Sequence, residues 1–193
     1  MRFVPAARPG IVLAAALLAA CDGTGRYAGD RLNPIDVGGV YQVCTLTFTP
    51  SQTALPVADL LQRVIETAPQ GGRPGPSVAL SSSAPRFDLV YTHRGDNFVR
   101  QIDGEVEFGQ NSVFLRMYTG SSAPGVPAEL LMPPHLDLVY TSSGPRRLTA
   151  GTEVSGYNVN RADYARAAGI TEDGLQPRIF GHVTALFSAQ GCG

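Results

Sequence analysis

The sequence predicts a mainly β fold: an antiparallel up-and-down barrel of about eight strands, accompanied by two short helices. Two observations point to it. Apolar and polar residues alternate in several separate segments, and turn-forming residues lie between those segments. A β-sandwich shows the same alternation and the same turns, so it stays open as the alternative architecture.

Six segments carry the alternation that is typical of strands with one buried face. Weaker patterns at residues 78–80 and 151–157 add candidate strands. Turn-forming residues at 96–97 and 109–111 lie where hairpin turns are expected. The six segments are residues 40–48, 87–92, 98–108, 113–117, 136–141 and 179–187.

Two of these strands repeat one another. Residues 87–92 read Phe-Asp-Leu-Val-Tyr-Thr, and residues 136–141 read Leu-Asp-Leu-Val-Tyr-Thr. We favour the interpretation that two strands meet the same packing requirement, with a duplicated hairpin as the alternative. Asp88 and Asp137 could suggest a pair of catalytic carboxylates, but outward-facing acids on a strand are usually solvated.

Two helices are expected between the strands. Residues 56–68 place apolar side chains on one stripe and carry a proline near the start. Residues 160–168 follow the pattern of a short helix that is capped by Asn160 and ended by Gly169. Residues 71–83 and 121–134 are rich in Pro, Ser or Gly and are expected to be loops.

The first 21 residues have the features of a secretory signal. Arg2 and Arg8 precede an apolar run at residues 11–20, which would rise only ~15 Å as a helix, about half of a bilayer core. The residues Leu18-Ala19-Ala20-Cys21 resemble a bacterial lipobox. That resemblance implies cleavage before Cys21 and lipid on its sulfur, whereas an ordinary secretory signal with a chance cysteine is the alternative.

The lipobox resemblance also sets the expected domain organisation and location. Residues 1–20 are the signal peptide, residues 21–37 a flexible Gly-rich tether, and residues 38–193 a single barrel-like domain. The mature protein is expected in the bacterial cell envelope, lipid-anchored to a membrane and facing the periplasm or the cell exterior. Whether that membrane is the inner or the outer one stays open.

Cys44 and Cys192 are expected to form a disulfide, because an exported compartment permits disulfides and the lipid occupies Cys21. Two unpaired thiols are the alternative. In the first strand, Val40, Cys44, Leu46 and Phe48 are expected to lie on one face.

Composition and motifs exclude several functional classes. Two of the 15 basic residues and none of the 16 acids precede residue 21, so the mature charge is −3, and no basic patch favours nucleic-acid binding. Lysine is absent, and no nucleophile elbow, phosphate-binding loop or zinc-protease motif occurs. His93, His135 and His182 are too scattered to predict zinc. We therefore predict no catalytic residues, no metal and no cofactor, and expect that the protein is not an enzyme.

Gly39-Val40-Tyr41 resembles the Gly-x-Trp or Gly-x-Tyr start of lipocalin-like barrels, a group that includes bacterial lipoproteins. The resemblance implies a closed meander whose last strand meets its first. The apolar strand faces suggest a small apolar ligand in the interior, with the helix at 56–68 across one mouth. The candidate ligand-binding residues are Tyr91, Phe98, Ile102, Leu115, Met117 and Tyr140.

The alternative is a structural or interaction lipoprotein, whose filled barrel presents loops to another envelope protein. The interior separates the two hypotheses. An open cavity lined by Tyr91, Phe98, Met117 and Tyr140 favours the ligand, and a packed core favours the interaction module.

Overall fold

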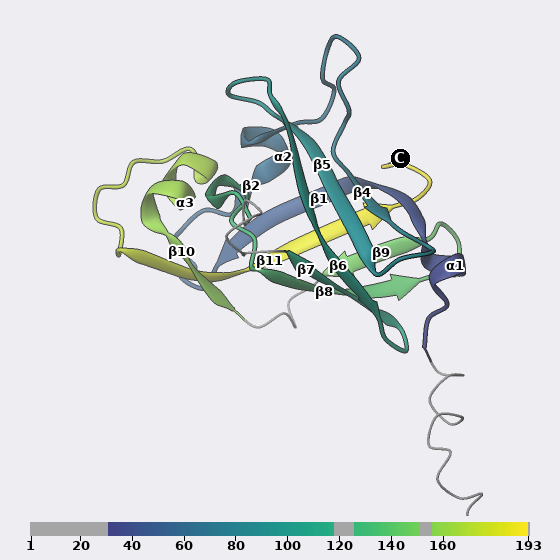
Figure 1. Cartoon of the computed structure of the whole chain (residues 1–193). Coiled ribbons are helices and arrows are strands. Elements are labelled where there is room, and N and C mark those ends of the chain that lie inside the picture. Colours follow the sequence, from purple (N-terminus) through teal and green to yellow (C-terminus); the bar gives the residue numbers. More distant parts are fainter. Residues whose placement is uncertain (1–30, 118–125, 151–155, 193) are drawn as a thin grey trace, which may run out of the picture. The chain divides into compact units, whose positions relative to one another are not determined.

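Eight antiparallel strands close into a barrel in the computed structural model (Figure 1), which describes residues 31–117, 126–150 and 156–192. Neighbours around the barrel follow the order β1-β4-β5-β6-β7-β8-β9-β11, and β11 pairs with β1 again. The predicted mainly β barrel is thereby confirmed. The eight strands are β1 (Gly39–Pro50), β4 (Ser77–Leu80), β5 (Arg86–His93), β6 (Val99–Phe108), β7 (Ser112–Met117), β8 (His135–Thr141), β9 (Arg147–Ala150) and β11 (Arg178–Ser188).

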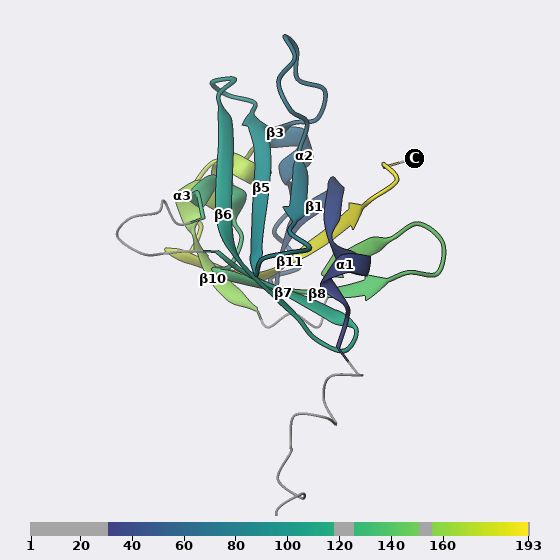
Figure 2. The same ribbon diagram turned by 45° about the vertical axis from the view of Figure 1, so that its right-hand side comes forward.

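The pairing of β1 with β11 closes the barrel and excludes the β-sandwich. The paired register begins at Gln42 opposite Ser188 and ends at Pro50 opposite Gly181. These two strands lie side by side in both ribbon views (Figures 1 and 2). The first and last strands of the domain therefore share one continuous hydrogen-bonded edge.

A β-bulge at Cys44 changes which residues of β1 face inward. The register with β11 shifts between Val43 and Thr45, so Cys44 is the extra residue of the pair. Tyr41 and Val43 are buried before the bulge, and Leu46 and Phe48 are buried after it. Val40 is 61% exposed. The expectation that Val40, Cys44, Leu46 and Phe48 share one face is therefore wrong, because the bulge reverses the alternation.

Large side chains fill the interior of the barrel. The repeated strands β5 and β8 contribute equivalent residues, since Phe87, Leu89, Leu136 and Leu138 are all buried. The other strands add aromatic and aliphatic residues to the same core, including Tyr41, Leu46, Phe48, Leu115, Val183 and Phe187.

The segment at 56–68 is not the long helix that its apolar stripe predicts. It contains β2 (Ala58–Asp59), a single turn α2 (Leu60–Arg63) and β3 (Ile65–Glu66). The Asp59 carboxylate accepts hydrogen bonds from the backbone N–H groups of the next residues and begins the turn. Ile65 and Glu66 then pair with β5, so sheet hydrogen bonds take the backbone groups that a longer helix would use.

The predicted helix at 160–168 is confirmed as α3 (Arg161–Ala168). The Asn160 side chain accepts a hydrogen bond from the N–H of Ala162 at 2.8 Å. Gly169 ends the helix with a φ of 71°, a left-handed conformation that glycine adopts without steric cost. A short strand, β10 (Tyr157–Asn160), precedes α3 and pairs with β11. Of the weak strand pattern at 151–157, residues 151–155 lie outside the described residues.

The folded domain begins earlier than residue 38. α1 (Pro34–Val37) is one helical turn whose Val37 is fully buried. Leu32 donates a backbone hydrogen bond to the carbonyl of Gly109 at 2.7 Å. The expected tether boundary at residue 37 is thus wrong, because Leu32 already contacts the barrel. Over the described residues, no helix has the length and hydropathy needed to cross a bilayer.

We predict that Gly104→Ala destabilises the barrel by about 1–3 kcal/mol, the usual cost of overpacking a core. A Cβ atom on Gly104 would lie 2.1 Å from the carbonyl oxygen of Arg116 in β7 and 2.7 Å from the Phe87 ring. The backbone oxygen cannot move without disturbing the β6–β7 pairing.

Gly75→Ala is the matched control for this substitution. Its Cβ atom would meet nothing closer than 3.7 Å, so the free energy of unfolding should change by less than about 0.5 kcal/mol. Urea unfolding followed by circular dichroism measures both variants. Equal stabilities would contradict the close approach of β6 and β7.

Candidate functional site

The predicted ligand-binding residues divide between the core and the surface. Four of them, Tyr91, Ile102, Leu115 and Met117, are buried members of the packed core. Tyr140 is only partly buried.

Phe98 does not face the interior, so that part of the prediction is wrong. Its side chain is 71% exposed. Phe98 lies in the β5–β6 turn, one residue before β6 begins. The turn contains Asn97 with a φ of 60°, and the Asp96 side chain accepts a hydrogen bond from the Phe98 N–H at 3.0 Å. These interactions place Phe98 beyond the end of the barrel, where no interior remains for it to face.

Five polar residues meet at the same end of the barrel, and we call them the Arg100 cluster: Tyr91, His93, Asp96, Arg100 and Glu129. The two terminal nitrogens of Arg100 contact Asp96 Oδ2 at 2.6 Å and Glu129 Oε1 at 2.9 Å. The Tyr91 hydroxyl donates to Glu129 Oε1 at 3.3 Å, and His93 Nδ1 lies 3.0 Å from Asp96 Oδ1. One guanidinium therefore joins the β5–β6 turn to Glu129.

Glu129 belongs to η1 (Ala128–Leu130), a 3-10 turn that covers this end of the barrel. The hydrophobic residues Leu130, Leu131 and Met132 are buried there. The Tyr157 hydroxyl donates to the carbonyl of Leu131, and α3 packs against η1. We refer to this as the η1 end.

The opposite end of the barrel is closed by α1, and we call it the α1 end. Arg146 donates to the carbonyl oxygens of Asp36 at 2.8 Å and Gly38 at 3.2 Å. Its guanidinium also lies 5.8 Å from the centre of the Tyr41 ring, and the Tyr41 hydroxyl donates to the carbonyl of Val37. Figure 1 shows α1 and α3 at opposite ends of the barrel.

The electrostatics of the Arg100 cluster favour a fixed arrangement of charges. The pKa of Asp96 is lowered to about 2. The hydrogen bond from the backbone N–H of Phe98 is the main cause, and His93 and Arg100 also contribute. Burial, followed by the nearby Glu129 carboxylate, raises the pKa of Tyr91. Asp96 is therefore ionised and Tyr91 protonated at neutral pH, so neither exchanges a proton readily there. The cluster is suited to holding the turn in place.

Over the described residues, hollows of about 460, 400 and 260 Å³ lie on the outside of the packed core. None of the six predicted ligand-binding residues lines any of the three. The 460 Å³ hollow lies against the outer face of β1 and includes Cys44 and Cys192 in its wall. The hollows are thus surface features and do not form the interior cavity that the ligand hypothesis requires.

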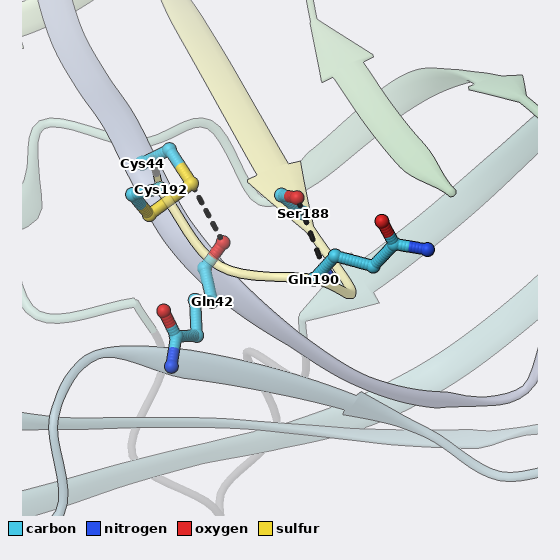
Figure 3. The surroundings of a disulfide bond; sticks show 5 residues. All are labelled: Gln42, Cys44, Ser188, Gln190 and Cys192. Carbon is cyan, nitrogen blue, oxygen red and sulfur yellow. Dashed lines mark hydrogen bonds between the residues drawn. A yellow bond between two sulfur atoms is a disulfide. The ribbon is translucent and has the colours of Figure 1, made fainter. Parts of the chain in front are cut away.

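The predicted disulfide between Cys44 and Cys192 is present, with a Cα–Cα distance of 5.1 Å (Figure 3). Cys44 is the bulge residue of β1, and Cys192 follows β11. Between β11 and Cys192 the chain turns, with the N–H of Gln190 donating to the Ser188 hydroxyl at 3.4 Å. A crosslink over 148 residues stabilises the fold by ~4–5 kcal/mol on the chain-entropy estimate.

The remaining polar candidates do not converge. Asp88 lies on β5 and Asp137 on β8, with β6 and β7 between those strands. His93 belongs to the Arg100 cluster, while His135 and His182 lie on β8 and β11. Within the described part of the chain, no three His, Cys, Asp or Glu side chains are close enough together to hold a metal ion.

We predict that Arg100→Gln raises the pKa of Asp96 above about 2 but leaves it below the ordinary value of 3.8. The substitution removes the charge of Arg100 and its hydrogen bond, whereas the Phe98 N–H and His93 remain.

Because the pKa of Asp96 is lowered in the folded protein, its contribution to stability is present above pH 3.8 and disappears as the pH falls toward 2. Carboxyl-carbon NMR titration measures the shift, with Arg147→Gln at the other end as the control. An unchanged pKa in the Arg100 variant would contradict the cluster.

No family model, no curated protein and no solved structure matches the chain. The resemblance to lipocalin-like barrels at Gly39-Val40-Tyr41 accordingly stays a prediction.

Proposed function

We propose that this protein is a lipid-anchored lipoprotein of the bacterial cell envelope whose filled barrel is an interaction module. The Leu18-Ala19-Ala20-Cys21 motif supports the lipid anchor at Cys21, and the Cys44–Cys192 disulfide is in keeping with an exported protein. The partner that we propose is another envelope protein, which contacts the β5–β6 turn at the η1 end. No catalytic step is part of the proposal.

The exposed Phe98 on a firmly held turn is the observation that carries this proposal. Phe98 is 71% exposed and its neighbour Val99 is 47% exposed, although both are large and apolar. Asp96 and Arg100 on either side of them are tied to His93 and Glu129. An aromatic side chain presented by a pre-organised turn loses little entropy on binding, which is typical of an interface hot spot.

The packed core favours this proposal over a small apolar ligand. A ligand in the barrel would need the space that Tyr91, Ile102, Leu115 and Met117 occupy. The two ends of the barrel are covered by η1 and α1, so a ligand would also have to displace one of them. Binding through the outer surface requires neither change.

The lipid anchor has a direct test. We expect Cys21→Ser to abolish metabolic labelling by an alkyne fatty acid, because the sulfur that accepts the lipid is removed. Cys44→Ser is the control, since Cys44 pairs with Cys192, and it should retain the label. Full labelling of the Cys21 variant would refute the anchor.

The interaction module is tested by a photo-crosslinking amino acid placed at Phe98 in living cells. We expect one discrete crosslinked protein from this position and none from Val139, which is 52% exposed at the other end of the barrel. Arg100→Gln should weaken the crosslink at Phe98 several-fold, because it releases the turn from Glu129. Equal crosslinking from both positions would contradict the proposed surface.

A titration with an environment-sensitive fatty-acid probe separates the two functions. We expect no saturable binding to the mature protein. Saturable binding that is lost in a folded Leu115→Arg variant would favour the apolar ligand instead.

A further inference from the structure

We propose that the α1 end of the barrel rests on the surface of the bilayer, and that Ile35 inserts into the membrane interface as a second contact beside the lipid. This inference rests on the proposed lipid anchor at Cys21. It specifies the partner of the α1 end as phospholipid, and it directs the η1 end with Phe98 away from the membrane.

The connection between tether and barrel supports this orientation. Leu32 is tied to the carbonyl of Gly109, in the turn between β6 and β7 at the α1 end. Cys21 lies eleven residues before Leu32, so even a fully extended tether reaches only about 40 Å. The anchor therefore holds Leu32, at the α1 end, within about 40 Å of the lipid, whatever path the tether takes.

Ile35 has the exposure that a membrane contact requires. It is 73% exposed, more than any other large apolar side chain among the described residues. It also lies only three positions after Leu32, where the tether joins the domain. Covering an apolar side chain this exposed with the headgroup region lowers the free energy, because apolar surface is removed from water.

Hydrogen bonds hold Ile35 in this exposed position. The Asn33 side chain accepts from the Ile35 N–H at 3.0 Å and begins α1. At the other end of the turn, Arg146 and the Tyr41 hydroxyl bind the carbonyl oxygens of Asp36 and Val37. Since Val37 is buried in the core, Ile35 cannot turn inward without unfolding α1.

Charges of both signs are exposed at the α1 end, so the proposed contact depends on the apolar burial of Ile35. Asp36 on α1 is exposed, and the exposed Arg147 at the start of β9 supplies an opposite charge at the same end. One such side chain would bind a membrane weakly from solution. The lipid makes the contact intramolecular, which raises its effective concentration enough for a weak contact to form.

The absence of tryptophan from the sequence allows a direct test. Ile35→Trp and Val57→Trp each introduce a single indole into the full-length lipidated protein. Val57 is 51% exposed and precedes β2 at the η1 end. In vesicles of phosphatidylethanolamine and phosphatidylglycerol, brominated phospholipids should quench the indole at position 35 at least threefold more than the indole at position 57. Equal quenching at the two positions would overturn the proposal.

A second pair of variants tests whether the quenching arises from the affinity of the indole itself for membranes. Ala84→Trp places the reporter beside Pro34, because Ala84 and Pro34 line the same 260 Å³ hollow. We expect quenching at this position to fall about twofold or more when Ile35→Ser is added. Unchanged quenching would show that Ile35 is not the contact and would overturn the proposal.

Fatty-acid labelling of each variant keeps the two proposals distinguishable. A labelled protein that shows no preferential quenching retains its anchor and lacks the Ile35 contact. An unlabelled protein instead contradicts the anchor at Cys21. Raising the salt concentration should leave the quenching at position 35 nearly unchanged, since screening weakens charge interactions and not apolar burial; loss of quenching in high salt would overturn the apolar character of the contact.

Discussion

The hydrogen-bonded pairing of β1 with β11 is the constraint on which the rest of the structure depends. β1 contacts β11 along one edge and β4 and β2 along the other, so it joins the two ends of the meander. The strands approach closely, since a Cβ atom on Gly181 would lie 2.4 Å from the carbonyl oxygen of Thr49. A separation of these two strands would open the barrel and expose the core along its length.

The bulge at Cys44 lets one strand satisfy two requirements. It turns Leu46 and Phe48 inward after Tyr41 and Val43, which preserves the apolar core on both sides of the irregularity. It also directs the Cys44 sulfur outward, where Cys192 meets it beyond the end of β11. The disulfide thereby stabilises the same pairing that closes the barrel.

The two ends of the barrel are closed by different chemistry, and this difference underlies both proposals. At the α1 end, Arg146 binds backbone carbonyl oxygens and Ile35 stays exposed. At the η1 end, Arg100 binds the carboxylate of Asp96 in its own turn and that of Glu129 from a separate segment. These ion pairs are partly exposed, so each adds little to global stability. Their effect is local: they hold the turn that carries Phe98.

Local sequence determined the strands, the capped helix α3 and the cysteines available for pairing, because alternation and caps act between near neighbours in the chain. Only the tertiary structure decided the bulge, the short β3 in place of a long helix, and the exposure of Phe98. Each of these depends on a partner strand or on where the barrel ends. The Arg100 cluster was likewise beyond prediction, since Glu129 reaches Arg100 and Tyr91 from a separate segment, and no local spacing encodes that contact.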